Sequence, residues 1–217
     1  MSNKPNRPAA AGDGNLVIVS GPSGAGKSAL TTHALGALPD IKFSVSYTTR
    51  SPRGAERSGV EYFFVSRREF EALRDAGEFL EWAEVHGNLY GTSQNFIDAL
   101  LRQGMDVILD IDVQGAGIIK KKRPDAIAVL VLPPSFDVLR ERLRRRGLDG
   151  EAVIEKRLGM ARDEISHYPD YDYLIVNDDL GRAERELDAI ILAARCRMDA
   201  RKHAAASILE HFGGLNV

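Results

Sequence analysis

The sequence has 217 residues with a formal net charge of -2, and 44% of its residues are hydrophobic. This composition is typical of a globular protein with one large domain or a core with small insertions, and the charge gives no general reason to expect a nucleic-acid partner. No apolar run reaches the ~20 residues of a transmembrane helix, and the single cysteine, Cys196, favours a reducing, cytoplasmic location, where we expect it to be a small buried residue on a late helix.

The first structured element that the sequence predicts is a strand that runs into a phosphate-binding loop. Residues 1–14 read as a disordered tail, whereas residues 16–28 read LVIVSGPSGAGKS. The match to G-x-x-x-x-G-K-[ST] provides glycines whose backbone N–H groups can surround a phosphate, a lysine for the outer phosphates and a serine hydroxyl for Mg²⁺. The residues predicted to bind nucleotide phosphates are Gly21, Pro22, Ser23, Gly24, Ala25, Gly26, Lys27 and Ser28.

The next part of the chain predicts short elements and a loop that carries two arginines. A second strand is expected over residues 41–46, followed by the loop with Arg50 and Arg53. The sequence SRRE at 66–69 is a capping-box pattern that predicts the start of a helix. Two short strands and this capped helix between residues 46 and 92 indicate a small α+β insertion.

Beyond residue 92, helices and apolar strands alternate. Such alternation indicates an α/β fold with a parallel sheet that is covered by helices on both faces. Ligands in such folds bind at the carboxyl ends of the strands, where the phosphate loop, Asp110 and Asp112 all lie. We therefore expect these groups to face one cleft. Strands are expected at 106–111, 126–132 and 173–177, and helices at 93–102, 113–122, 138–146, 151–167 and 181–211.

A phosphate loop alone fits several classes of protein, and the other residues narrow the choice. The chain has neither the N-K-x-D motif nor the switch segments of a GTPase, and its strand at 106–111 ends in D-I-D rather than the D-E of many motor ATPases. Arg142 and Arg146 share a helix face, and Arg157 lies on the next helix. A phosphoryl-transfer enzyme needs such cations around the transferred group, although an arginine-rich helix can also be a solvated face or a nucleic-acid patch.

Several separate stretches resemble the guanylate kinases, the nucleoside monophosphate kinases that phosphorylate GMP. The resemblance spans residues 15–197 and departs at Ala29, where family members often have Ser or Thr. It implies a P-loop core (15–45, 93–137 and 169–217), a GMP-binding insertion (46–92) and a helical lid (138–168) after a tail at 1–14. The stretches are SGPSGAGKS at 20–28, FSVSYTTRSPR at 43–53, GVEYFFVS at 59–66, EFLEWAEVHGNLYGT at 78–92, ILDIDVQG at 108–115, LPPS at 132–135, RLRRRG at 142–147 and IVNDDL at 175–180.

The resemblance also implies roles for individual residues in the transfer of the γ-phosphoryl group of ATP to GMP or dGMP. ATP and GMP are the expected partners, with no nucleic acid or membrane, and the segment after Arg197 is compatible with a homo-oligomer. Ser28 would bind Mg²⁺, Asp110 would act on the metal through water, and Asn177 would lie near the adenine. Lys27, Arg50, Arg142, Arg146 and Arg157 would be catalytic, with Arg142 and Arg146 also on the ATP phosphates. GMP would be bound by Ser46, Arg50, Arg53, Tyr62, Glu81, Tyr90, Gly91, Thr92 and Asp112.

The chemistry of two carboxylates agrees with guanine. The guanine edge presents two adjacent donors, N1–H and the exocyclic amine, and an ionised carboxylate only accepts. Glu81 and Asp112 can therefore pair with guanine and would repel the acceptor at N1 of adenine, and a group left unpaired can reject a wrong ligand by roughly 10⁴–10⁵-fold. Two alternatives stay open. A non-catalytic guanylate-kinase-like scaffold module would lose phosphate-loop or GMP-site residues, and a phosphate-loop kinase for a phosphorylated sugar would not need this carboxylate pair.

Overall fold

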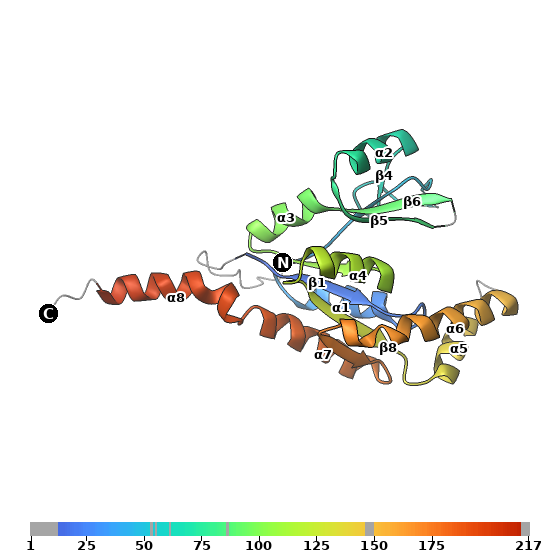
Figure 1. Cartoon of the computed structure of the whole chain (residues 1–217). Coiled ribbons are helices and arrows are strands. Elements are labelled where there is room, and N and C mark those ends of the chain that lie inside the picture. The colour runs from blue at the N-terminus through green and yellow to red at the C-terminus, as the bar shows by residue number, and fades with distance from the viewer. Residues whose placement is uncertain are drawn as a thin grey trace.

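The computed structural model describes residues 13–52, 54, 56–60, 62–85, 87–145 and 150–213. Within these ranges the chain forms a five-stranded sheet and a four-stranded sheet, each with helices packed against it (Figure 1). In the same ranges, none of the helices combines the length and the apolar character that crossing a membrane requires.

The five-stranded sheet is parallel, and its strands are the apolar stretches of the sequence. β1 lies in its middle, and side chains alternate along this strand, with Val17 and Val19 on one face and Leu16 and Ile18 on the other. Both faces are therefore apolar and need covering helices, which confirms the predicted α/β fold class. The order is β2-β7-β1-β8-β9, formed by β1 (Leu16–Ser20), β2 (Ile41–Phe43), β7 (Asp106–Asp110), β8 (Ile127–Leu132) and β9 (Tyr173–Val176).

Two pairs of helices cover the two faces of this sheet. Leu30 and Leu187 are fully buried against the Val17 face, and Ile97 and Ile119 are fully buried against the opposite face. Each buried aliphatic side chain of this size stabilises the fold by about 1.5–3 kcal/mol relative to exposure. The first pair is α1 (Lys27–Ala37) and α7 (Leu180–Ala194), and the second is α3 (Gln94–Arg102) and α4 (Val113–Lys122).

The carboxyl ends of β1 and β7 meet at one edge of the sheet. The register places Val19 of β1 opposite Asp110 of β7, and the Ile111 amide continues the pairing with a 3.2 Å hydrogen bond to the Val19 carbonyl. The phosphate loop after β1 and the acidic segment after β7 are therefore neighbours, as the sequence predicts.

The four-stranded sheet forms a second layer, which lies above the core in Figure 1. The capping box that opens its helix is confirmed, because the Ser66 hydroxyl accepts from the Glu69 amide at 3.2 Å and the Glu69 carboxylate accepts from the Ser66 amide at 2.8 Å. Phe70 of this helix is fully buried, and its ring centroid lies 4.5 Å from that of Phe79. The elements are β3 (Ser46–Thr48), β4 (Tyr62–Phe64), α2 (Arg67–Asp75), β5 (Phe79–Val85) and β6 (Asn88–Ser93), with strand order β4-β3-β6-β5.

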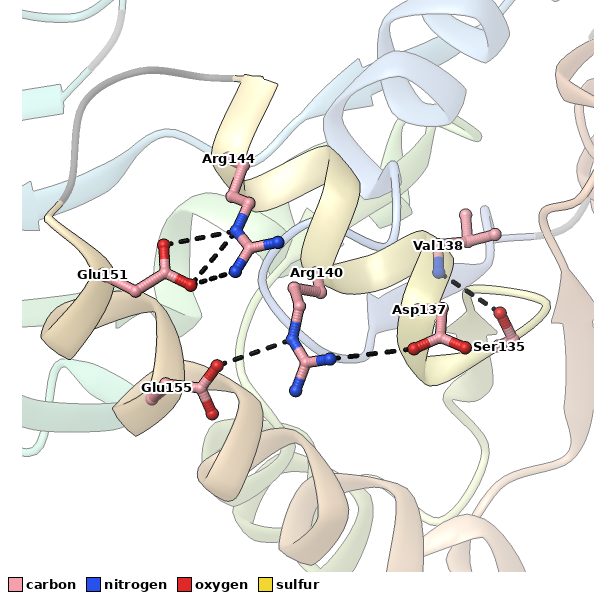
Figure 2. Close-up of polar contacts among 7 residues, drawn as sticks. All are labelled: Ser135, Asp137, Val138, Arg140, Arg144, Glu151 and Glu155. Carbon is pink, nitrogen blue, oxygen red and sulfur yellow. Dashed lines mark hydrogen bonds and ion pairs between the residues drawn. The ribbon is translucent and has the colours of Figure 1, made fainter.

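A helical pair, α5 (Phe136–Arg145) and α6 (Glu151–Ser166), follows β8 and has an apolar cluster of its own. Ser135 caps α5, since its hydroxyl accepts from the Val138 amide at 3.2 Å. Figure 2 shows two arginines of α5 reaching across to two glutamates of α6. The pair is therefore held by packing inside and by charges at its surface. The cluster consists of Leu139, Leu143, Ile154, Leu158 and Ala161.

The prediction of one strand over 41–46 is wrong. β2 ends at Phe43, and Ser46 already begins β3 of the other sheet. The Ser44 amide still bonds to the core, with a 3.0 Å hydrogen bond to the Ile108 carbonyl, and the chain then enters the second layer. The described part of that layer contains four strands rather than the two that were expected. The segments of β3 and β6 are among the strands, and they pair with each other.

The prediction of one final helix over 181–211 is also wrong. α7 ends at Ala194, and α8 (Met198–Gly213) begins after a break at which Arg195 turns inward to Asp106. Cys196 lies in this break and is exposed rather than buried. Its exposure follows from the path of α8, which extends away from the sheet in Figure 1 instead of packing on it.

Candidate active site

The phosphate loop connects β1 to α1, and its glycines meet steric demands. A Cβ atom on Gly21 would lie 2.1 Å from the Val131 carbonyl oxygen, so a side chain does not fit where the loop passes β8. Gly26 has a φ of 102° at the N-terminus of α1, a conformation that favours glycine. The Ala29 amide bonds to the Gly26 carbonyl at 3.1 Å, so the helix starts at the loop and directs its positive end at the space in front of it.

Lys27 and Ser28 converge on Asp110 at the end of β7. The Lys27 ammonium donates to the Gly21 carbonyl at 2.7 Å and lies 4.0 Å from the Asp110 carboxylate, and the Ser28 hydroxyl donates to the other Asp110 oxygen at 2.9 Å. A hydroxyl and a carboxylate oxygen are hard ligands of the kind that Mg²⁺ prefers. The Ser28 hydroxyl and the Asp110 carboxylate therefore fit the predicted Mg²⁺ ion.

A pocket of about 290 Å³ lies in front of the loop. It brings together most of the predicted phosphate-binding residues, although Pro22 and Ala25 are buried behind it. Asp110 at the end of β7 and the next two residues, Ile111 and Asp112, form one wall of it. The lining residues are Gly21, Ser23, Gly24, Gly26, Lys27, Ser28, Asp110, Ile111, Asp112 and Glu164.

A second pocket, also of about 290 Å³, lies between the two sheets. It shares the wall formed by Asp110, Ile111 and Asp112 with the first pocket. The second pocket therefore adjoins the phosphate loop from the side of the four-stranded sheet. Its lining residues are Ser46, Tyr62, Glu81, Ala83, Tyr90, Asp110, Ile111, Asp112 and Gly115, five of which are predicted GMP-binding residues.

Glu81 and Asp112 approach each other around Gly115. A Cβ atom at Gly115 would lie 3.6 Å from an oxygen of each carboxylate. Burial raises the pKa of Glu81, and the Asp112 charge acts in the same direction, whereas the Thr92 hydrogen bond and the Lys122 charge oppose them. The Thr92 hydroxyl donates to Glu81 at 2.6 Å and orients it. Two carboxylate acceptors thus face one pocket, as reading the donor edge of guanine requires.

Among the described residues, three predicted GMP-binding residues do not line this pocket: Thr92, which bonds to Glu81, Arg50 and Gly91. Arg50 lies over the ring of Tyr62 at 5.3 Å and forms a two-pronged hydrogen bond with Glu56, with both distances 3.0 Å. The Glu56 contact raises the pKa of Arg50 further. Gly91 faces the aromatic rings behind the sheet, because a Cβ atom there would lie 3.0 Å from Phe70 and Phe79. Arg50 is thus at the pocket's edge, and Gly91 allows β6 to pack.

The predicted ATP-side residues of the lid, and Asn177 after β9, have different positions. Arg142 donates to the Asn177 carbonyl at 2.8 Å and to the Ala25 carbonyl at 3.4 Å. Asn177 is 3% exposed, and its side chain donates to Ala25 at 2.8 Å. Arg157 lies on α6 and is half-buried. Arg53 and Arg146 lie outside the described residues.

Sequence reasoning missed two acidic residues near the predicted cations. Glu164 of α6 lines the phosphate pocket, and burial raises its pKa while the Lys27 charge opposes this shift. Glu164 lies seven residues, or two helical turns, after Arg157, and residues at this spacing share a helix face. This spacing could have indicated that Glu164 faces the same site as Arg157. Glu56, the partner of Arg50, lies in a loop without periodicity, and no sequence pattern marks it.

Comparison with known proteins identifies the family to which the chain belongs. The guanylate kinase family model matches residues 13–194. The chain belongs to the guanylate kinase family. It is 49% identical to the guanylate kinase of Hahella chejuensis over 189 residues, which are 87% of this chain and 91% of that protein. It is 47% identical to the guanylate kinase of Idiomarina loihiensis, with 93% and 97% of the two chains covered.

A solved guanylate kinase structure shows the same fold. The crystal structure of guanylate kinase from Anaplasma phagocytophilum has a TM-score of 0.68 and 33% identity, and the match covers 88% of this chain and 91% of that one. The predicted family and fold class are therefore confirmed. As a guanylate kinase, the chain is an enzyme that phosphorylates GMP with ATP.

Proposed function

We propose that the chain transfers the γ-phosphoryl group directly from ATP in the phosphate-loop pocket to GMP in the second pocket. The observation that carries this assignment is the wall of Asp110, Ile111 and Asp112 that the two pockets share. A shared wall allows the attacking oxygen of GMP to approach the γ-phosphorus without a covalent enzyme intermediate. The insertion (46–92) would bind GMP, and the lid (138–168) would close over the phosphates.

The GMP pocket is proposed to recognise its ligand at two ends. Glu81 and Asp112 accept from the guanine N1–H and amine, with Thr92 holding Glu81 in place through its 2.6 Å hydrogen bond. Arg50, Arg53, Tyr62 and Tyr90 would hold the phosphate at the other end. Arg50 and Tyr62 already lie together, with 5.3 Å between the guanidinium and the ring centroid. The arginine fork suits a phosphate better than a lysine would.

On the ATP side, cations are proposed to stabilise the charge that spreads over the transferred group. Lys27 lies in the pocket between the loop and Asp110, and Arg146 and Arg157 would be brought in by the lid. Ser28 and Asp110 would hold Mg²⁺, Asp110 through water, and when bound this ion neutralises phosphate charge. Lid closure would keep water from the γ-phosphoryl group.

The location and the assembly of the protein are inferred from its composition and from the exposed surface of α8. The composition and the single cysteine support a cytoplasmic location. α8 exposes Leu209 and Phe212, whose relative exposures are 72% and 69%, and this apolar surface supports a homo-oligomer.

The experiment is a measurement of ADP production from ATP and Mg²⁺ with GMP, AMP, CMP, UMP or ribose phosphates supplied separately. We expect ADP production only when GMP is the acceptor supplied with ATP and Mg²⁺. Lys27→Ala should lower kcat by about 10²–10³-fold, the usual effect of removing a group that stabilises the transition state. Glu81→Ala should sharply raise KM for GMP, whereas its control, Glu84→Ala on the same strand, should not, because Glu84 pairs with Arg67 outside the pocket. Turnover with a sugar phosphate instead would contradict the proposal.

A further inference from the structure

The buried side of the phosphate loop is held by a junction of three elements. The Ala25 carbonyl accepts from the Asn177 side chain at 2.8 Å and from Arg142 at 3.4 Å, and Arg142 also donates to the Asn177 carbonyl at 2.8 Å. Ala25 belongs to the loop, Asn177 follows β9, and Arg142 belongs to α5. One carbonyl of the loop thus joins the sheet to the first helix of the lid.

The same side of the loop is also packed sterically. A Cβ atom on Gly26 would lie 2.2 Å from the Asn177 amide nitrogen, and one on Gly24 would lie 2.9 Å from Leu139 and 3.2 Å from Leu143. Asn177 and the inner face of α5 therefore occupy the space that side chains on these glycines would need. Gly24 and Gly26 have φ values of 94° and 102°. Their contacts behind the loop therefore constrain the backbone conformation of the loop.

The side-chain amide of Asn177 is buried and donates directly to a carbonyl of the loop. Asn177 is 3% exposed, so little of its side chain can reach a ligand. Arg142 is partly exposed, but two backbone carbonyls occupy its guanidinium on the loop side. Both side chains therefore act on the loop from behind.

We propose that Asn177 is a positioning residue that sets the shape of the phosphate loop through the Ala25 carbonyl, and that Arg142 ties α5 of the lid to the same carbonyl. The docking of the lid's first helix and the phosphate-binding shape of the loop are then coupled. This inference rests on the proposed function only in assigning the triphosphate to the loop.

The test separates loop positioning from an adenine contact by using a ligand that has no adenine. Isothermal titration measures the Kd of MgATP, of magnesium tripolyphosphate and of GMP for the wild type, Asn177→Ala and Arg142→Met. Loss of a hydrogen bond to a buried carbonyl should weaken ATP and tripolyphosphate by the same factor, about tenfold for Asn177→Ala. The Kd of GMP should change less than twofold. The double variant should lose less than the product of the single factors, because both donors share one acceptor.

Arg145→Met is the matched control on the same helix. The Arg145 side chain is 78% exposed and pairs with Glu141, so its removal should leave all three affinities unchanged. Thermal unfolding of every variant shows whether its fold is retained, and Arg142→Met provides a second route if Asn177→Ala is unstable.

Three results would overturn the inference. One is weaker ATP binding with unchanged tripolyphosphate binding in Asn177→Ala, which would assign Asn177 to the adenine. Another is an equal loss of GMP affinity, which would indicate general destabilisation. The third is unchanged binding of both phosphate ligands in Asn177→Ala and Arg142→Met. If the wild type itself fails to bind tripolyphosphate but binds GMP, the assignment of the triphosphate to the loop fails first.

Discussion

At the scale of single residues, the GMP site depends on two carboxylates that a glycine allows to face one pocket. Glu81 comes from β5 and Asp112 from the start of α4, where it also caps the helix by accepting from the Gly115 amide at 2.8 Å. Burial raises the pKa of Glu81, so its charged form is less stable than that of an exposed glutamate. The site therefore holds an acceptor that is sensitive to pH.

Binding of GMP should weaken as the pH falls, and at a higher pH than an ordinary glutamate would cause. The acid form of Glu81 carries a proton where guanine needs an acceptor, and its raised pKa moves that protonation upward. The groups that face Glu81 are Asp112, Lys122 and Thr92. We expect the affinity advantage of the wild type over Glu81→Gln to shrink as the pH falls, beginning above the range around pH 4.3 in which an ordinary glutamate titrates.

The measurement is the Kd of GMP for both proteins as the pH is lowered. Because the phosphate of GMP titrates equally in both experiments, the ratio of the two Kd values isolates Glu81. A ratio that stays constant with pH would show that this carboxyl does not accept from guanine.

Gly115→Ala should separate stability from substrate binding. The added Cβ atom would lie at ordinary contact distances, 3.5 Å from Ile111 and 3.6 Å from each carboxylate, so the fold accommodates it. Alanine in a helix is favoured over glycine by roughly 0.5–1 kcal/mol, so the free energy of unfolding should not fall. The methyl group would occupy space between the two acceptors, and we expect KM for GMP to rise about tenfold.

Gly117→Ala in the same helix is the control. Beyond its chain neighbours and the backbone of its own helix, no described atom lies within 4 Å of the added Cβ, so this variant should keep the wild-type KM. Urea unfolding and steady-state kinetics on both variants test this prediction, and an unchanged KM in Gly115→Ala would contradict it.

At the scale of elements, the lid pair owes its stability to its core rather than to its surface charges. Leu158 is fully buried in the cluster between α5 and α6. The ion pairs drawn in Figure 2, Arg144 with Glu151 and Arg140 with Glu155, lie at the solvent side. Exposed ion pairs are screened by water and salt and contribute little to stability.

Leu158→Ala should therefore destabilise the lid far more than Glu151→Ala. Removing a buried leucine costs about 2–5 kcal/mol, and here the loss falls on the packing of α5 against α6. Hydrogen exchange followed by mass spectrometry should show faster exchange over the α5–α6 pair in Leu158→Ala, with the central sheet unchanged. Glu151→Ala should exchange like the wild type, and equal effects of the two variants would contradict this account.

At the scale of the whole molecule, a buried ion pair joins distant parts of the chain. Arg195 at the end of α7 donates to Asp106 at 2.6 Å and to the Pro39 carbonyl at 2.6 Å. The other Asp106 oxygen accepts from the backbone and side chain of Asn15, at 2.7 and 2.9 Å. The start of β1, the start of β7 and the end of α7 thus meet at the edge of the sheet opposite the active site.

Arg195→Met should lower the free energy of unfolding by about 3–5 kcal/mol, because it leaves the fully buried Asp106 carboxylate without its ion partner. Arg197→Met is the control, since Arg197 is 52% exposed and pairs with Asp199 at the surface. Urea unfolding followed by circular dichroism measures both. A change in Arg195→Met no larger than that of the control would show that this pair does not stabilise the fold.

Much of the fold follows from local patterns in the sequence. The apolar strands, the capping box at Ser66 and the phosphate loop are all local, since hydrophobic period, side-chain caps and glycine spacing act over a few residues. The resemblance to guanylate kinases added the GMP-site residues, and the structure brings Ser46, Tyr62, Glu81, Tyr90 and Asp112 to one pocket.

Only the tertiary structure decided features that depend on contacts between distant residues. The final helix breaks because Arg195 finds a buried partner 89 positions earlier in the chain. The strand expected over 41–46 divides because its second half pairs in another sheet. Glu164 enters the phosphate pocket from α6, and Asn177 bonds to Ala25 across 152 positions. The sequence by itself determined most of the elements and the chemistry of the phosphate loop. Chain packing decided where two elements divide and which side chains meet, because long-range pairing leaves no periodic signal.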